Sequence, residues 1–527
     1  MIIADLVRRS CQSYSANVAV ADTATSLTYG QVWDRSVRLV NALRSLGVMP
    51  GDRVATLGAN AVTTLEEMTG LAIGGYARTA LHGMNGGETH AYMLAHVEAR
   101  ALIVQAEHFA KFHEFFAAAP SLQHIIVHSA PGFSPPAGGI DYEELLAAAS
   151  PVDPHVPVGG DDLIHLAFSS GSSGKPKPAA HTQQGWMHVT TDHLTMLPRL
   201  SEADVYLAAA PLTHAASTVL YGLLARGSRI QVMPGFDPGE ALRLIERERC
   251  SLTVMVPTML QMLVGHPDVH TRDLSSLRAV LYAGAPISVA TARAAHAALG
   301  DVLFQTYGQS ECLPATILTP EDHALGVREN AALLRSAGRP CLNSSVRVLD
   351  AGGRDAGVGE VGEIVIHTQG RMREIFNNPE LTRSRITADG FVRTKDNGYL
   401  DAKGYLFVVD RIDDMIISGG FNIWPAEIEN VLAEHPAVEE ALVVGVAHAK
   451  WGETPHAVVT IRAGATTSEQ ELIAFCRDRL GSMKKPTAVV LRTQPLPRNA
   501  VGKLSRPAIR QLYWPGPLDV DRNISGA

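Results

Sequence analysis

Short apolar runs alternate with amphipathic helical segments along the first 400 residues, and this alternation constrains the fold more than any other feature. Asp52–Leu57 and Ala101–Val104 are expected to form buried strands. Between Leu27 and Gly47 apolar residues repeat at helical spacing, and Thr28 is available as the N-cap. The pattern favours α/β layers with partly parallel sheets. At 527 residues the chain exceeds what one hydrophobic core usually serves, so we expect at least two domains.

The pattern of apolar and glycine residues changes near residue 350. Several glycines punctuate short alternating strands such as residues 363–366, which predicts a small, strongly turned β-unit. The charged run Asp410–Asp414 then precedes a stretch long enough for a compact α/β domain. We therefore expect a large N-terminal domain over residues 1–410, made of α/β layers plus the β-unit, and a small α/β C-terminal domain over residues 411–527.

Charge and composition exclude several classes of function. With 45 Lys+Arg against 53 Asp+Glu, the net charge of −8 gives no electrostatic reason to expect nucleic acid as a partner. A composition of 46% apolar and 19% charged residues excludes intrinsic disorder. The uncharged stretches 115–140 and 205–225 are interrupted by proline or polar residues, so we expect no membrane insertion. Five scattered cysteines without a CxxC pair favour a reducing compartment, and we expect a cytoplasmic protein.

The segment Phe168–Pro178, FSSGSSGKPKP, is the most informative for chemistry. Its six consecutive small residues let a backbone wrap closely around an anion and supply N–H and hydroxyl donors, while two lysines add positive charge. A flexible Ser/Gly linker is the alternative. A P-loop is rejected because Ser169 replaces its first glycine and Pro176 stands where Ser or Thr is needed. The candidate phosphate ligands are Ser169, Ser170, Gly171, Ser172, Ser173, Gly174, Lys175 and Lys177.

This segment closely resembles the Ser/Thr/Gly-rich loop of the adenylate-forming superfamily, which includes acyl-CoA synthetases, peptide-synthetase adenylation domains and firefly luciferase. Further signatures of that superfamily follow in the expected order over nearly the whole chain. They are Pro211–His214, Gly284–Pro286, Tyr307–Glu311, Arg393–Asp396, Asp410–Glu429 and Pro497–Lys503. The resemblance implies an acyl-CoA synthetase-like fold and a two-step reaction. A carboxylic acid and ATP first give acyl-AMP, and CoA then takes the acyl group as a thioester.

Each motif also has a chemical reason. A carboxylate that attacks the α-phosphate of ATP is one anion approaching another, so cationic and hydrogen-bond stabilisation must dominate. By resemblance Lys503 is the catalytic cation. Adenine and phosphate contacts are implied for Gly284, Ala285, Pro286, Tyr307, Gly308 and Ser310, and ribose contacts for Asp396 and Arg411. Glu311 is implied as the Mg²⁺ ligand, in keeping with the preference of that hard cation for oxygen.

The acyl and CoA sides are implied by the remaining motifs. His214 is expected near the acyl carboxylate, although a structural histidine in the core is the alternative. The resemblance implies a lid domain that turns about Asp413, with a loop at Gly419 and Gly420 lining a tunnel for the CoA pantetheine arm. Trp451 is a candidate contact for the CoA nucleotide. The other closely spaced histidines, His181, His188 and His193, match no usual metal-ligand spacing and are expected to be structural.

Two residues depart from the superfamily pattern. Pro178 stands at the end of the phosphate loop, where glycine is usual, and it lacks an N–H donor. Lys395 replaces the glycine beside the expected ribose ligand Asp396. If that position needs a positive φ, a lysine there costs about 1 kcal/mol and could tilt Asp396. We therefore weigh two alternatives, namely a complete ligase that tolerates both changes and an enzyme whose adenylation step is weakened while thioesterification survives.

The substrate is less well determined than the reaction. Residues 213–217 contain no acid that could hold an α-ammonium group, and small residues there leave room for a bulky apolar acid. The expected small molecules are therefore such an acid or its adenylate, ATP or acyl-AMP, Mg²⁺ and coenzyme A. An adenylation enzyme that loads a carrier protein and a non-catalytic acyl or nucleotide binder remain as alternatives, and a homodimer is left open.

Overall fold

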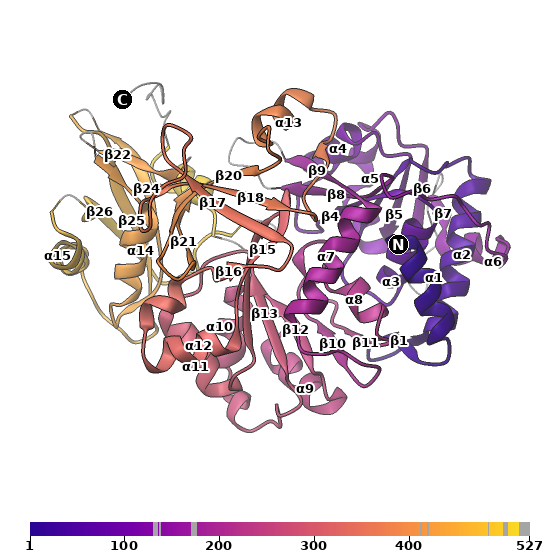
Figure 1. Cartoon of the computed structure of the whole chain (residues 1–527), viewed down its shortest axis with the longest axis horizontal. Helices are drawn as coiled ribbons and strands as arrows, with labels where there is room; N and C mark the ends of the chain where they lie inside the picture. Colours follow the sequence, from indigo (N-terminus) through magenta and orange to yellow (C-terminus); the bar gives the residue numbers. More distant parts are fainter. Residues whose placement is uncertain are drawn as a thin grey trace. The chain divides into compact units, whose positions relative to one another are not determined.

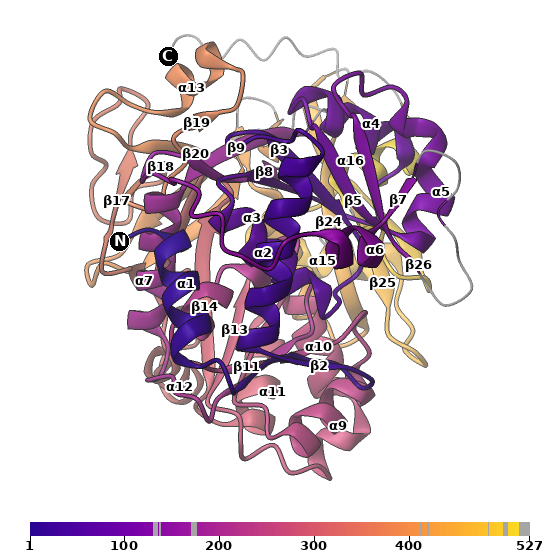
Figure 2. The ribbon, with the colours of Figure 1, turned by 90° about the vertical axis from the view of Figure 1, so that its right-hand side faces the viewer.

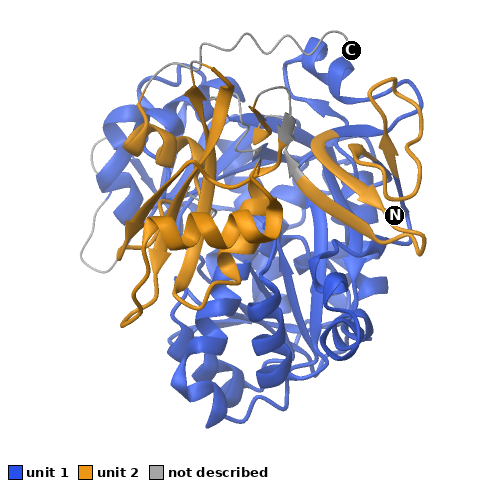
Figure 3. Ribbon diagram, turned by 90° about the vertical axis from the view of Figure 1, so that its left-hand side faces the viewer, with its two compact units in different colours: residues 1–346, 366–393 blue, residues 347–365, 394–527 orange. Residues whose placement is uncertain are grey.

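The structure is a computed structural model, and it describes residues 1–129, 135, 139–169, 176–411, 414–418, 421–448, 450–482, 484–498 and 504–515 (Figure 1). By their internal contacts the described residues fall into two units, each discontinuous in sequence (Figure 3). Unit 1 comprises residues 1–346 and 366–393, and unit 2 comprises residues 347–365 and 394–527.

The first sheet of unit 1 has the strand order β19-β9-β8-β4-β3-β5-β6-β7. Its strands are β3 (Arg53–Leu57), β4 (Ala77–Leu81), β5 (Ala101–Gln105), β6 (His124–His128), β7 (Gly139–Asp141), β8 (Leu163–Ser169), β9 (Lys177–Thr182) and β19 (Glu374–Ile375). Strands β4, β3, β5, β6 and β7 run parallel, whereas β9 pairs antiparallel with both of its neighbours. Strands β3 and β5 confirm the two strands expected from the sequence.

The second sheet of unit 1 has the order β16-β15-β14-β13-β12-β10-β11-β1-β2. Its strands are β1 (Val18–Ala21), β2 (Ser26–Thr28), β10 (Val205–Ala208), β11 (Arg229–Val232), β12 (Leu252–Met255), β13 (Ala279–Ala283), β14 (Leu303–Gln309), β15 (Cys312–Leu318) and β16 (Arg339–Pro340). From β1 to β14 the neighbouring strands across the centre of this sheet are parallel, and β15 turns back antiparallel to β14.

Helices connect and cover these strands. They are α1 (Ile3–Ser13), α2 (Tyr29–Ser45), α3 (Thr63–Ile73), α4 (Gly87–His96), α5 (Ala106–Phe116), α6 (Tyr142–Ala148), α7 (Gln183–Met196), α8 (Leu220–Leu224), α9 (Pro238–Glu248), α10 (Pro257–Gly265), α11 (Val289–Leu299), α12 (Pro320–Arg328) and α13 (Pro379–Arg385), with 3₁₀ turns at Ala215–Ser217, Pro267–His270 and Ala331–Arg335. Helix α2 begins where the sequence predicted, because the Thr28 hydroxyl accepts the backbone N–H of Gln31. Figure 2 shows α1, α2 and α3 side by side, and these helices contact one another.

The β-unit expected after residue 350 is a sheet with the order β17-β18-β20-β21, made by β17 (Ser344–Leu349), β18 (Gly362–Thr368), β20 (Val392–Leu400) and β21 (Leu406–Arg411). The rest of unit 2 forms a second α/β layer around the order β23-β22-β25-β24, with β26 paired to β25. Its elements are β22 (Ile416–Ser418), β23 (Phe421–Ile423), α14 (Pro425–Ala433), β24 (Val438–His448), β25 (Gly452–Ile461), α15 (Glu469–Leu480), β26 (Ala488–Arg492) and α16 (Arg506–Tyr513). Apolar side chains of α14, α15 and the sheet, among them Ile428, Leu432, Val443 and Leu472, form its core.

Among the described residues, no helix is both long enough and apolar enough to cross a lipid bilayer.

Candidate active site

The expected phosphate loop joins two antiparallel strands of the first sheet. Strands β8 and β9 pair from Leu163 opposite Thr182 to Ser169 opposite Lys177, so the two ends of the loop are neighbours. Residues 170–175, which include most of the expected phosphate ligands, lie outside the described residues, as does the side chain of Ser169. The ladder therefore fixes where the loop begins and ends.

Pro178 leaves this ladder intact. It pairs with Phe168 across β8 and β9, and its carbonyl accepts the backbone N–H of Phe376 at 2.9 Å. In an antiparallel ladder the N–H and C=O of one residue point to the same neighbour. The missing N–H of Pro178 therefore faces the β19 side, and the proline removes no hydrogen bond from the β8–β9 frame of the loop.

The residues expected around adenine meet at one edge of the second sheet. Strands β13 and β14 are parallel neighbours, with Ala283 opposite Thr306. The next residues are Gly284, which opens a turn with Ala285 and Pro286, and Tyr307, the last aromatic residue of β14. Gly284 has φ +91°, a conformation that side chains rarely adopt, so glycine suits the turn. Register thus brings the turn and Tyr307 side by side.

The Tyr307–Glu311 motif forms the hairpin between β14 and β15. Gln309 pairs with Cys312, so Ser310 and Glu311 make the turn itself. The register shifts between Tyr307 and Gln309, and a Cβ at Gly308 would lie 2.9 Å from the carbonyl oxygen of Cys312. Real Cβ atoms rarely come so close to backbone, so Gly308 lets the two strands approach each other above the turn.

Two other segments of unit 1 hold this turn. The Nε2 of His181, on β9, lies 2.7 Å from the carbonyl oxygen of Ser310, and the backbone N–H of Met372 donates to the carbonyl of Glu311 at 2.8 Å. Burial lowers the pKa of His181 to about 4. Its imidazole is therefore neutral at pH 7 and donates one N–H to Ser310, which ties the turn to the strand that leaves the phosphate loop.

The Glu311 carboxylate is buried beside a cation. Its side chain is 8% exposed, and its Oε1 lies 3.4 Å from a terminal nitrogen of Arg385. The same Arg385 nitrogen donates to the Gln309 side-chain oxygen at 3.2 Å. Sequence reasoning did not single out Arg385, which follows Glu311 only after a long stretch of chain.

The expected substrate-side histidine is held by its neighbours in unit 1. The Thr213 hydroxyl lies 2.9 Å from Nδ1 of His214, and the His82 ring meets the His214 ring edge-on at a centroid distance of 5.3 Å. The buried amide of Asn60 donates to the carbonyls of Ala208 and Ala210 and accepts the backbone N–H of Leu212 at 2.8 Å. Asn60 therefore fixes the segment that leads to His214, a role that sequence reasoning missed.

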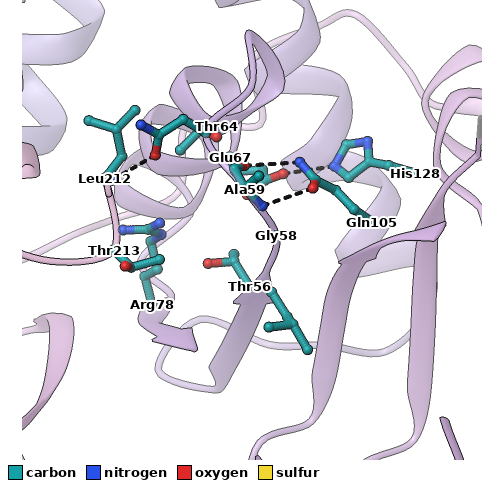
Figure 4. Close-up of a pocket in the computed structure, with 12 residues that line it drawn as sticks. Thr56, Gly58, Ala59, Thr64, Glu67, Arg78, Gln105, His128, Leu212 and Thr213 are labelled. Atoms are coloured by element: carbon teal, nitrogen blue, oxygen red, sulfur yellow. Dashed lines mark hydrogen bonds and ion pairs between the residues drawn. The ribbon is translucent and has the colours of Figure 1, made fainter. Parts of the chain in front are cut away.

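A small polar cavity lies beside this segment, lined by Arg78, Thr56 and Thr213 among others (Figure 4). Its volume of about 20 Å³ is enough for a water molecule. Arg78 is 5% exposed, burial lowers its pKa, and its Nε has no hydrogen-bond partner among the described residues. The Thr56 hydroxyl is equally without a partner there. The Nε–H of Arg78 and the Thr56 hydroxyl can therefore donate hydrogen bonds to an oxygen atom in the cavity.

The expected ribose ligand lies on β20 in unit 2. Asp396 is buried, and its backbone N–H donates to the Thr394 hydroxyl at 3.1 Å, which in turn donates to the Ile364 carbonyl at 2.7 Å. Lys395 between them has φ +60° and an exposed side chain. Position 395 therefore has the left-handed backbone that glycine adopts without strain. A lysine in this conformation costs about 1 kcal/mol of stability. Asp396 pairs in register with Arg411, whose side chain lies outside the description.

The residues expected to serve the second step are mostly beyond the described ranges. Asp413, Gly419, Gly420 and Lys503 all lie outside them. Trp451 is described in unit 2, where 44% of the residue is exposed and the Lys450 ammonium lies 4.7 Å from its ring centroid. An exposed indole beside a cation is a surface that can meet a nucleotide.

Comparison with known proteins places this architecture in a family. Residues 7–376 match the AMP-binding enzyme family, and residues 427–503 match the AMP-binding enzyme C-terminal domain. The chain therefore belongs to the AMP-binding enzymes, in the acyl-CoA synthetase branch of the adenylate-forming superfamily that the motifs indicated. The expected α/β fold with a large N-terminal part and a smaller C-terminal part is confirmed.

Individual relatives span the whole chain. A feruloyl-CoA synthase from Amycolatopsis sp is 36% identical and covers 96% of this chain and 98% of its own. The medium/long-chain-fatty-acid–CoA ligase FadD8 of Mycobacterium tuberculosis is 34% identical, over 93% of this chain and 86% of its own. Among solved structures, the amide bond synthetase McbA from Marinactinospora thermotolerans has a TM-score of 0.87 at 28% identity and covers 97% of this chain and 100% of its own.

Proposed function

We propose that this enzyme is an AMP-forming acid–CoA ligase. It activates a bulky, largely apolar carboxylic acid with ATP and transfers the acyl group to CoA. The observation that carries this proposal is the convergence in unit 1 of the Gly284 turn, Tyr307 and the buried Glu311 next to the strand that leaves the phosphate loop. Relatives named as CoA ligases, which match the chain over more than nine-tenths of its length, support the same reaction.

Residues of the chain divide the first step among them. The acid and the α-phosphate of ATP are both anions, so the step needs cations at the point where negative charge accumulates. Lys503 supplies one, and the donors of the phosphate loop supply hydrogen bonds. Tyr307 offers a ring face to adenine, and Asp396 accepts hydrogen bonds from the ribose hydroxyls. His214 stands next to the acyl carboxylate, with its ring orientation set by Thr213 and His82.

Glu311 fits the role of metal ligand. Mg²⁺ is usually held by one or two carboxylates together with substrate phosphates, and Glu311 is a single carboxylate on a turn held from two sides. Bound there, Mg²⁺ would neutralise charge on the ATP phosphates. The protein's own part is to keep the carboxylate in place, through His181 and Met372.

For the second step we propose that residues 411–527 act as a mobile lid with its hinge near Asp413. In one orientation the lid brings Lys503 to the ATP site. In the other, the loop at Gly419 and Gly420 lines the path of the CoA pantetheine arm, and Trp451 contacts the CoA nucleotide. Glycine suits such a path because a thin arm needs close approach to backbone. Cysteine usage further favours a cytoplasmic enzyme.

The acid itself is proposed by class. Ala215 and Ala216 beside His214, and the absence of an acidic residue in 213–217, favour a bulky apolar acid over an amino acid. Relatives named for feruloyl, indoleacetate and medium/long-chain fatty acid substrates all fall in that class. An aromatic or fatty acid is therefore the first choice for assay.

A second candidate function rests on the backbone of Lys395. Because its φ of +60° strains the residue next to Asp396, ATP binding and adenylation could be weakened while transfer from a ready-made acyl-adenylate remains. The enzyme would then act mainly in thioesterification. Pro178 gives this candidate no support, since the β8–β9 ladder keeps its hydrogen bonds.

One set of assays separates the candidates. Acid-dependent exchange between ATP and pyrophosphate reports adenylation, and acyl transfer from a synthetic acyl-adenylate to CoA or to a carrier protein reports the second step. We expect both activities, with CoA as the acceptor. Transfer without exchange would instead support the thioesterification enzyme, transfer to a carrier protein alone would support a carrier-loading enzyme, and neither activity would indicate a binding protein.

Lys503→Ala tests the assignment of roles within the same assays. Two unit charges about 4 Å apart interact by about 4 kcal/mol at an effective dielectric near 20, which corresponds to two to three decades of rate. Exchange should therefore fall about 100-fold or more, while transfer from the acyl-adenylate should change far less. An unchanged exchange rate would contradict the role given to Lys503.

A further inference from the structure

Arg385 is the last residue of α13, and its guanidinium is held by two hydrogen bonds and one ion pair within unit 1. Its side chain is 13% exposed. One terminal nitrogen lies 3.4 Å from Oε1 of Glu311 and donates to the side-chain oxygen of Gln309 at 3.2 Å. Its Nε donates to the carbonyl of Arg393 at 2.8 Å. Because more than one nitrogen of the guanidinium is bound, the group keeps one orientation. This cation is therefore held in place beside the Tyr307–Glu311 motif.

The position of Arg385 is tied to the frame of the phosphate loop. The Thr382 hydroxyl of α13 accepts the backbone N–H of Ile375 on β19 at 3.0 Å, and β19 pairs with β9, the strand that follows the loop. The same β9 carries His181, which holds the carbonyl of Ser310. Arg385, Glu311 and the downstream end of the loop are therefore fixed to one another through β9.

We propose that Arg385 is an additional ATP-binding residue, a built-in cation that neutralises Glu311 and faces the polyphosphate. The inference rests on the proposed function, in which Glu311 lies at the ATP phosphates. A bare carboxylate there would repel the phosphates until a metal ion arrived. A guanidinium 3.4 Å away cancels that charge in advance.

This role differs from that of a purely structural ion pair in its dependence on metal. If Arg385 screens Glu311 from ATP, its removal weakens ATP binding most when no divalent cation is present to take its place. If the pair only stabilises the fold, its removal affects ATP binding equally with and without metal. The comparison of the two conditions is thus more informative than either condition alone.

The test is calorimetric titration of the full-length enzyme with ATP, without acid, once in EDTA and once in excess Mg²⁺. For Arg385→Met we expect the Kd for ATP to rise about tenfold or more in EDTA and less than about threefold in Mg²⁺. Arg385→Lys keeps the charge and should recover most of the affinity in EDTA. Arg383→Met, an exposed arginine on the same helix, is the matched control and should bind ATP as the wild type does.

The double variant Glu311→Gln/Arg385→Met separates screening from a folding defect, because it removes both charges of the pair together. It should regain most of the wild-type affinity in EDTA, since there is no longer a carboxylate to screen. Equal losses in both conditions for Arg385→Met, or no loss in either, would overturn the inference while leaving the proposed function in place. A wild-type enzyme that binds ATP in neither condition would contradict the proposed function itself.

Discussion

Two acids are proposed to bind ATP, and the molecule holds them in different ways. In unit 1, Glu311 lies on a turn fixed by His181, Met372 and Arg385, three residues from separate segments. In unit 2, the backbone N–H of Asp396 donates to Thr394 of the same strand, whose hydroxyl donates to Ile364 of the neighbouring strand β18, and Asp396 follows a lysine with φ +60°. The region around Glu311 has glycine at Gly284 and Gly308, where the backbone needs it. The region around Asp396 has Lys395 at a position where glycine would be unstrained. The contrast shows that the two regions are built differently, with a side chain held from several segments at Glu311 and a strained backbone beside Asp396.

Removing each acid in turn gives the largest expected difference between the regions. Glu311→Gln should lower the rate of acid-dependent ATP–pyrophosphate exchange about 100-fold at saturating ATP, because the variant loses the carboxylate that is proposed to hold Mg²⁺ at the reacting phosphates. Asp396→Asn should instead raise the KM for ATP about tenfold with a smaller effect on the maximal rate, since it weakens charge-assisted hydrogen bonds to a part of ATP that does not react. Identical effects of the two variants on rate and KM would remove the distinction.

The pH dependence of stability tests the buried contact between His181 and the turn. Because burial lowers the pKa of His181 to about 4, only the unfolded chain takes up this proton between about pH 6.5 and pH 4, and stability falls as the pH falls through that window. Comparison with His181→Gln in urea unfolding isolates the residue. Between pH 6.5 and pH 5 the wild type should lose about 1.5 kcal/mol more of its free energy of unfolding than the variant does.

The matched control for this measurement is His270→Gln, because His270 is an exposed histidine. Its substitution should leave the pH dependence as in the wild type. If His181→Gln also leaves it unchanged, His181 is not the neutral donor to Ser310 that the geometry indicates.

The tight hairpin at Gly308 offers a second test of the region around Glu311. Gly308→Ala places a Cβ 2.9 Å from the Cys312 carbonyl, so backbone must shift and the free energy of unfolding should fall by about 1–3 kcal/mol. Exchange should fall with it, since the turn carries Glu311. Gly235→Ala, where a Cβ meets no atom within 4 Å, is the control. A Gly308→Ala enzyme as stable as that control would show that the strands can separate without cost.

The smallest expected effect on stability and exchange concerns Lys395, beside Asp396. Lys395→Gly relieves a left-handed backbone and should raise the free energy of unfolding by about 0.5–1 kcal/mol, with a modest gain in the exchange rate. Lys395→Ala removes the charge but keeps the Cβ, so it should remain close to the wild type. If the alanine and glycine variants gain equally, charge rather than backbone strain accounts for the effect.

Sequence reasoning reached the local structure and the order of motifs but not the contacts between distant segments. Helical spacing and Thr28 placed α2, and apolar runs placed β3 and β5, because these depend on neighbours in sequence. The cost of a lysine at position 395 could also be anticipated, since it depends on one residue's backbone. By contrast, His181 meets Ser310 across 129 positions and Asn60 meets Leu212 across 152, and only the pairing of strands brings them together.

The most direct test of the proposed reaction is identification of the products formed from ATP, CoA and an apolar aromatic or fatty acid. We expect acyl-CoA and AMP in equal amounts, with no AMP formed when the acid is left out. Formation of ADP in place of AMP, or of no AMP with any acid of that class by an enzyme that binds ATP, would contradict it.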